Sequence, residues 1–290
     1  MRRHTFLLVL LPVLASGLVA CGSDEPRLTP DAYQGVLTDL DKSLDPAFDG
    51  VGAALTPEDL SKALTATATS LTSQADKLAQ VRPPETVDAA HGKLRTALDE
   101  LAGDLTSLSQ DAQDKKLCTG GSGLPRAASA DGANQVRQAA QELTTADSGR
   151  AFTVGAFLPV GTPDQTRRPA NGSLPGGRGG GGGELTVNAS SDADAVVKLT
   201  QGTEVIRNVF VQAGGSATAD EIPDGTYEVF YTVGTDWDDV NARFTRDCDF
   251  SKFDETLSYD RYTSYELTLY GVISGNASTS SVDPGAFPGS

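Results

Sequence analysis

The spacing of apolar residues changes abruptly along this chain, on either side of a glycine-rich segment. From Thr29 to about Thr145, apolar side chains recur every three or four residues, which places them on one face of an α-helix. Beyond Glu184, short β-branched and aromatic runs alternate with turn residues, which is typical of β-strands. Because each pattern occupies its own half of the chain, we predict an α+β fold of two domains, the helical one first.

The first half is expected to form a bundle of helices over residues 29–160. Two helices begin at Thr29-Pro30 and Thr56-Pro57, each a capping residue followed by proline in the first turn. A third follows Pro83-Pro84, and a shorter fourth is expected around residues 136–143. Each has a single apolar stripe, so we predict an up-down bundle that buries the stripes together. The third helix has the most regular stripe: Val87, His91, Leu94, Leu98, Leu101, Leu105, Leu108 and Ala112.

The second half is expected to form an antiparallel β-sandwich over residues 184–290, with about seven short strands. Residues 161–183, which separate the two halves, are rich in glycine and end in Gly179–Gly183. Because such a composition buries no core, we predict a flexible interdomain linker there. A phosphate-binding loop would need a preceding strand, a following helix and a Lys-Ser/Thr ending, and the segment has none of these.

The amino-terminal residues have the pattern of a secretion signal. Arg2 and Arg3 precede an apolar run from Thr5 to Ala20, which is shorter than a membrane-spanning helix needs. We therefore predict a signal peptide over residues 1–20 that is removed on export.

The end of this run, Leu18-Val19-Ala20-Cys21, resembles the lipobox of bacterial lipoproteins. The resemblance implies that the thiol of Cys21 takes a diacylglycerol and that residues 21–28 form a lipidated tether. Burial of the acyl chains would then hold the protein to the outer side of the cell membrane. The expected location is extracytoplasmic and lipid-anchored, with the lipid membrane as the first partner. The alternative is an ordinary secreted protein that is cut after Ala20 and carries Cys21 without lipid.

Charge excludes one class of partner. The chain has a net charge of -16, which becomes -18 if Arg2 and Arg3 leave with the signal. From Glu184 to Ser290 there are 18 acidic residues against 6 basic ones. Because such a surface repels phosphate backbones, nucleic acid is not expected as a partner.

The acidic residues gather around the single tryptophan, where Asp236, Asp238 and Asp239 flank Trp237. Clustered carboxylates can hold calcium, and Trp237 could stack on a sugar ring, so these four residues are a possible binding site. The spacing does not fit an EF-hand, because the sixth position is Asn241 rather than glycine. We therefore favour a solvated acidic rim without a metal, and leave calcium open.

Cysteine usage predicts a disulfide between the two domains. With Cys21 assigned to lipid, Cys118 and Cys248 remain in a compartment where disulfides persist. They lie on opposite sides of the glycine-rich segment, so a bridge would join the two halves. Two unpaired buried thiols are the alternative. A zinc site is not expected, because two thiols lack the further ligands that tetrahedral zinc needs.

Several motifs of the chain resemble a β-sandwich module of exported actinobacterial proteins, a module without an assigned activity. The helical half likewise resembles the amino-terminal part of lipoproteins that carry this module. The resemblance implies location and architecture, and no mechanism. The matching segments are Pro83-Pro84 with Ala90-His91, Leu117–Gly120, Ile222–Tyr227, Gly234–Asp238, Phe244–Cys248, Gly275–Ala277 and Val282–Pro284.

The residue pattern does not predict an enzyme or a cofactor. His91 is the one histidine left after signal removal, and we expect it to be hydrogen-bonded at the core edge; a ligand or general base is the alternative. There is no nucleophile elbow, metal-ligand spacing or cofactor fingerprint. We expect an envelope lipoprotein that acts by binding or scaffolding, with an envelope protein or a glycan as partner. Alternatives are a carbohydrate- or peptidoglycan-binding module centred on Trp237, or a cryptic carboxylate-based hydrolase.

Overall fold

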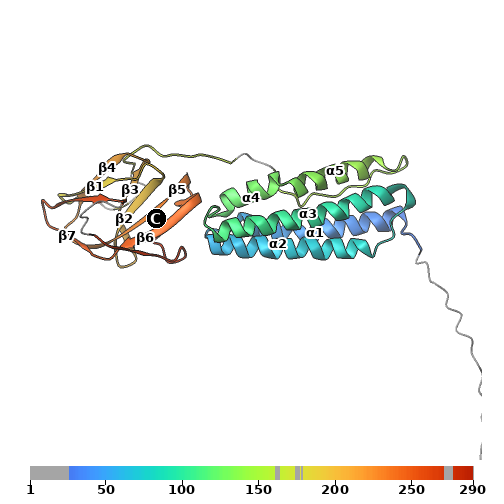
Figure 1. The fold of residues 1–290 in the computed structure, drawn as a ribbon, viewed down its shortest axis with the longest axis horizontal. Coiled ribbons are helices and arrows are strands. Elements are labelled where there is room, and N and C mark those ends of the chain that lie inside the picture. The colour runs from blue at the N-terminus through green and yellow to red at the C-terminus, as the bar shows by residue number, and fades with distance from the viewer. Residues whose placement is uncertain (1–25, 161–163, 174–176, 178, 271–276, 290) are drawn as a thin grey trace, which may run out of the picture.

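The computed structural model describes residues 26–160, 164–173, 177, 179–270 and 277–289. They form a bundle of helices and a β-sandwich that lie end to end along one long axis (Figure 1). The predicted α+β layout of two domains is therefore confirmed. Within the described residues, no helix combines the length and the apolar character that crossing a membrane requires.

The bundle helices begin where the capping signals predict. The side chain of Thr29 accepts a hydrogen bond from the Ala32 amide, and that of Thr56 accepts one from the Asp59 amide. Leucine and alanine stripes from the long helices then pack into one core. The helices are α1 (Pro30–Gly52), α2 (Pro57–Ala79), α3 (Asp88–Gln113), α4 (Gly120–Ser129) and α5 (Asp131–Thr145), with a 3-10 turn, η1 (Glu85–Val87), before α3.

The sequence did not predict α4, because its glycines and Pro125 are typical of a loop. These glycines instead allow close packing. A Cβ atom on Gly120 would lie 2.3 Å from the carbonyl oxygen of Gly52, and one on Gly123 would lie 2.6 Å from a methyl group of Leu60. The helix can therefore approach α1 and α2 only because these positions carry no side chain.

His91 is buried in the bundle core, hydrogen-bonded as expected. Its Nε2–H donates to the carbonyl oxygen of Leu78 at 3.1 Å, so Nδ1 accepts from the hydroxyl of Tyr33 at 3.0 Å. Burial lowers the pKa of His91 below its ordinary value of 6.5, which favours the neutral ring. The histidine has a structural role between three helices.

The sandwich contains two sheets, with strand orders β4-β1-β8 and β3-β2-β5-β6-β9, and β7 pairs with β5. The pairs are antiparallel, as predicted for the sandwich, except that β1 and β8 run parallel. Hairpins force neighbouring strands to run antiparallel, whereas β8 reaches β1 after a long connection that permits either direction. The strands are β1 (Gly183–Asn188), β2 (Asp194–Gln201), β3 (Glu204–Val211), β4 (Ser216–Ile222), β5 (Gly225–Asp238), β6 (Arg243–Phe253), β7 (Leu257–Tyr259), β8 (Ser264–Thr268) and β9 (Thr279–Ser281).

The longer sheet is buried on both faces. Val197 on β2 packs into the core between the two sheets, whereas Val196 belongs to a second apolar cluster on the opposite face. That second face is covered in part by the chain after β9, which contributes Phe287, and Lys198 donates a hydrogen bond of 2.8 Å to the carbonyl oxygen of Pro288. Burial on both sides explains why seven of the eight residues of β2 are buried, although only half of them are apolar.

The segment predicted to be a flexible linker is docked on the sandwich over its described parts. The Gly172 amide donates to the carbonyl oxygen of Phe210 at 2.8 Å, and the Phe210 amide donates to that of Ser173 at 2.9 Å. Nearer the junction, the Trp237 amide donates to the carbonyl oxygen of Arg167 at 3.0 Å. These backbone hydrogen bonds, which composition cannot foresee, replace the free linker that we predicted.

Candidate functional site

Cys21 and the predicted signal peptide lie outside the described residues. Cys118, Cys248 and Asp236 meet where the bundle touches the sandwich. The loop between α3 and α4 runs beside β6 in the manner of an added strand. The Cys118 amide donates to the carbonyl oxygen of Thr245 at 2.8 Å, and the Cys248 amide donates to that of Lys115 at 3.1 Å. The helical domain therefore extends the edge of the sandwich sheet by main-chain hydrogen bonds.

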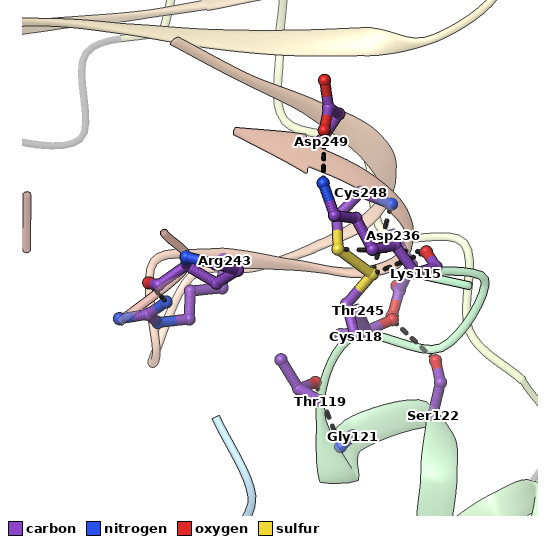
Figure 2. Close-up of a disulfide and its surroundings, with 11 residues drawn as sticks. Lys115, Cys118, Thr119, Gly121, Ser122, Asp236, Arg243, Thr245, Cys248 and Asp249 are labelled. Carbon is purple, nitrogen blue, oxygen red and sulfur yellow. Dashed lines mark hydrogen bonds and ion pairs between the residues drawn. A yellow bond between two sulfur atoms is a disulfide. The ribbon is translucent and has the colours of Figure 1, made fainter. Parts of the chain in front are cut away.

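A disulfide joins Cys118 to Cys248 at this contact (Figure 2). Their Cα atoms lie 6.3 Å apart, and 130 residues separate them in sequence. Both side chains are buried in the apolar cluster on the outer face of the longer sheet. At the solvent edge, Lys115 and Asp249 form an ion pair of 2.7 Å between the two domains. The predicted bridge is thus present, and it links the bundle covalently to the sandwich.

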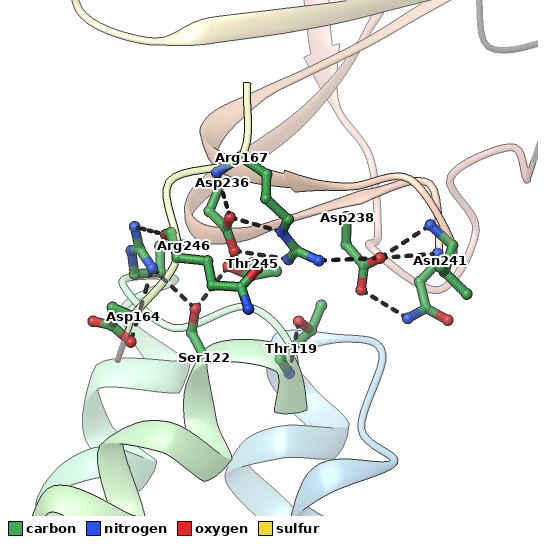
Figure 3. A network of polar contacts seen from close by, with 12 residues as sticks. Thr119, Ser122, Asp164, Arg167, Asp236, Asp238, Asn241, Thr245 and Arg246 are labelled. Atoms are coloured by element: carbon green, nitrogen blue, oxygen red, sulfur yellow. Dashed lines mark hydrogen bonds and ion pairs between the residues drawn. The ribbon is translucent and has the colours of Figure 1, made fainter. Parts of the chain in front are cut away.

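Arg246 lies at the centre of a polar network next to the disulfide (Figure 3). Its guanidinium donates to the carbonyl oxygen of Gln165 at 2.7 Å and to the hydroxyl of Ser122 at 3.3 Å. The hydroxyls of Ser122 and Thr245 share a hydrogen bond of 2.7 Å. One buried cation from β6 is therefore held by α4 and by the docked segment at once, which resists bending at the junction.

Asp236 is the buried anion of this network. Its carboxylate accepts hydrogen bonds from the backbone amide and the guanidinium of Arg167, at 2.8 to 2.9 Å, and from the hydroxyl of Thr245 at 2.6 Å. Burial alone would raise the pKa of Asp236, but these hydrogen bonds hold it below its ordinary value of 3.8. The carboxylate is thus ionised and fully occupied by the protein.

The other predicted binding residues do not form a binding face. Trp237 is 1 % exposed and packs edge-on against Phe244, with ring centroids 5.0 Å apart, so it cannot stack on a sugar. Asp238 accepts hydrogen bonds from the backbone amide and side chain of Asn241, and Asp239 is exposed. Among the described residues, no group of three or more His, Cys, Asp or Glu side chains could hold a metal ion.

A cleft of about 240 Å³ beside this network is also lined by acids, but arginines neutralise the two buried ones. Arg167 binds Asp236, and Arg168 donates to both carboxylate oxygens of Asp194 at 2.9 Å. A glycoside-cleaving pair needs one carboxyl with a raised pKa. Because Asp236 has a lowered pKa, it does not fit the general acid of the hydrolase alternative.

A second pocket, which the sequence reasoning missed, lies among the loops around β7. It measures about 650 Å³ and is lined by Gly180–Gly182, Pro223, Asp224, Arg261 and Tyr262. We call it the tip pocket. The glycine run was the sequence feature that could have indicated this pocket, but a glycine-rich sequence is equally typical of a linker. No turn motif precedes Tyr262, so the sequence did not indicate that this residue is exposed.

No protein-family model, curated protein or solved structure matches this chain. The resemblance to actinobacterial lipoproteins therefore stays a prediction. The junction, the tip pocket and the order of the elements along the chain are the features of the molecule that bear on its function.

Proposed function

We propose that the protein is a membrane-anchored envelope lipoprotein that acts by binding or scaffolding outside the cytoplasm. In this proposal, acylated Cys21 holds the chain to the membrane, the bundle is a spacer and the sandwich is the head that meets the partner. The observation that carries it is the junction between bundle and sandwich, which a disulfide and main-chain hydrogen bonds hold together. Such a junction suits a spacer, since a spacer sets a distance only if its joint does not bend.

The direction of α1 supports the spacer role. The helix α1 begins at the end of the bundle remote from the sandwich and runs toward the sandwich (Figure 1). At 1.5 Å per residue, its 23 residues span roughly 35 Å. A lipid on Cys21, nine residues before α1, would keep the remote end of the bundle nearer the membrane and present the sandwich about 35 Å beyond the start of α1.

The contacts at the junction support the same role. A disulfide, main-chain hydrogen bonds and the buried Arg246 join the two domains at one contact. A free linker would serve a tethered enzyme equally well, whereas a scaffold or receptor gains from a fixed head orientation. This junction is the reason to favour binding over catalysis.

Membrane fractionation of the Cys21→Ser variant tests the anchor. We expect the variant in the medium and the wild type in the membrane fraction, because the acyl chains supply the membrane affinity. Cys118→Ser with Cys248→Ser is the matched control, since it removes the other two cysteines, and it should remain with the membrane. Retention of the Cys21→Ser variant on membranes at high salt would show that the anchor lies elsewhere.

Neutron reflectometry of the lipidated protein on a supported bilayer tests the spacer. An upright bundle should leave a layer of roughly 35 Å between the bilayer and the denser head. A single thin layer with the width of one helical bundle, at low surface coverage, would mean that the molecule lies flat. The spacer role would then be abandoned, although the anchor could still hold.

A further inference from the structure

The tip pocket lies at the end of the sandwich opposite the bundle. Asp236, near the end of β5, contacts the junction, whereas Gly225 begins the same strand. The strand of 14 residues spans roughly 40 Å, so its two ends are at opposite ends of the head. β7 pairs with Gly225–Tyr227 and lies farthest from the bundle (Figure 1). On a spacer of this kind, the tip pocket is the part of the head most remote from the membrane.

Glycine backbone forms one wall of the tip pocket. A Cβ atom on Gly181 would lie 1.9 Å from the carbonyl oxygen of Ile222, and one on Gly182 would lie 2.1 Å from that of Arg261. The run is therefore threaded between two loops, with no room for side chains. The Gly181 amide donates to the carbonyl oxygen of Glu221 at 3.1 Å, which holds the wall in place.

The opposite walls are also held by hydrogen bonds. The Tyr227 hydroxyl donates to the carbonyl oxygen of Pro223 at 2.9 Å, which pins the loop that carries Asp224. The Thr263 amide donates to the carbonyl oxygen of Asp260 at 3.1 Å, which closes the turn that carries Arg261 and Tyr262. The pocket is thus largely preformed, as small-molecule sites usually are.

Tyr262 gives the pocket an exposed aromatic surface. Its side chain is 82 % exposed, and the Arg261 guanidinium carbon lies 5.8 Å from its ring centroid. Arginine packing on an aromatic ring is favourable and restrains the ring. With the residue so exposed, most of the ring surface stays available to a ligand.

We propose that the tip pocket binds a neutral saccharide. The apolar face of a sugar ring would pack on Tyr262, as flat amphipathic surfaces do on tyrosine. Sugar hydroxyls both donate and accept hydrogen bonds, and the pocket offers an acceptor in the Asp224 carboxylate and donors in the Arg261 guanidinium. The acidic head, with 18 acidic and 6 basic residues after residue 183, disfavours anionic glycans.

The saccharide site rests on the proposed function, in which the sandwich is the head that meets the partner. Here that partner is a neutral saccharide. It also relocates the glycan contact that the sequence assigned to Trp237, which is buried at the junction. The sequence predicted an aromatic residue together with carboxylates there; an exposed aromatic and a carboxylate instead line one pocket at Tyr262 and Asp224.

A glycan array tests the proposal with the full chain carrying Cys21→Ser, so that no acyl group contributes to binding. The array carries neutral oligosaccharides of hexoses, pentoses and N-acetylhexosamines, and anionic ones containing uronic acids. We expect binding to a neutral member, with affinity reduced at least tenfold by Tyr262→Ala and by Asp224→Ala. Tyr270→Ala is the matched control, because Tyr270 is exposed and does not line the pocket.

Each outcome decides the matter. No binding to any neutral glycan at millimolar concentration, binding to anionic glycans only, or binding unchanged by Tyr262→Ala would overturn the proposal. Equal melting temperatures of Tyr262→Ala and the parent would exclude misfolding as the cause of a loss. Because the parent here lacks the lipid, failure of the anchor in fractionation and failure of glycan binding are separate results.

Discussion

Removing the disulfide should uncouple the two domains. Cys118→Ala with Cys248→Ala opens a loop whose ends are 130 residues apart in sequence. In the chain-entropy model, closing a loop of that length restricts the unfolded chain by about 5 kcal/mol at 25 °C. The main-chain hydrogen bonds of the junction remain in the variant, so the native contact itself is largely kept. We therefore expect a loss of about 3 to 5 kcal/mol in the free energy of unfolding.

Differential scanning calorimetry in the Cys21→Ser background measures this loss. For a chain of this size, roughly 2 °C per kcal/mol predicts a fall in Tm of about 6 to 10 °C. The bundle and the sandwich have separate cores, so we also expect two transitions in the variant where the parent has one. Adding reductant to the parent should reproduce the variant.

Lys115→Ala is the control for the junction, because it removes only the exposed ion pair with Asp249. Such a pair contributes less than about 1 kcal/mol, so its Tm should stay within about 2 °C of the parent. A variant without Cys118 and Cys248 that melts as one transition at the parental Tm would refute the coupling. The junction would then be held by its polar network alone.

Two further predictions concern buried charges. Asp236→Asn should lower the free energy of unfolding by about 2 kcal/mol at pH 7, because Arg167 loses its counter-charge. The folded-state pKa of Asp236 lies below 3.8, so the difference in free energy between variant and wild type should shrink as pH falls below that value. Lys198→Met should stabilise the protein by about 1 to 3 kcal/mol at pH 7, because burial lowers the pKa of Lys198 to about 8 and a charged amine is then buried. As pH rises from 8 toward 10.5 the wild type should gain stability, since only its unfolded state still binds the proton, and the advantage of methionine should disappear.

Urea unfolding at several pH values measures both effects. A deficit in Asp236→Asn that is the same at pH 7 and pH 3 would mean that the lost interaction is not ionic. A destabilised Lys198→Met variant would mean that the hydrogen bond from Lys198 to the carbonyl oxygen of Pro288 outweighs the burial of charge.

Features that depend on residues close together in the sequence could be predicted from it. The caps at Thr29 and Thr56 are local, because each depends on a side chain and an amide three residues away. The disulfide could be predicted by counting, since the assignment of Cys21 to lipid leaves a single pair of cysteines. The division into helices and strands followed from the period of the apolar residues.

Non-local contacts explain what the sequence analysis missed. Asp236 and Trp237 lie among acidic residues in the sequence, which is typical of an exposed rim. The structure buries both, because Arg167, 69 residues away, neutralises the carboxylate, and Phe210 and Phe244 surround the indole ring. Arg167 and Phe210 lie far from this cluster in the sequence, so the acidic residues predicted a surface where there is a core.

The glycine-rich segments show the same ambiguity in its strongest form. Glycine is frequent both where a chain is free and where two backbones must touch, and composition cannot separate these cases. In α4 and at Gly181 the deciding atoms belong to Gly52, Leu60 and Ile222, each far away in the sequence. The positions that looked most flexible are therefore those where a single added methyl group would collide with backbone or core atoms. One such position lies at the junction end of the bundle, and another lies in the wall of the tip pocket. Close glycine contacts therefore occur at both ends of the sandwich, where it meets the bundle and where the proposed saccharide site lies.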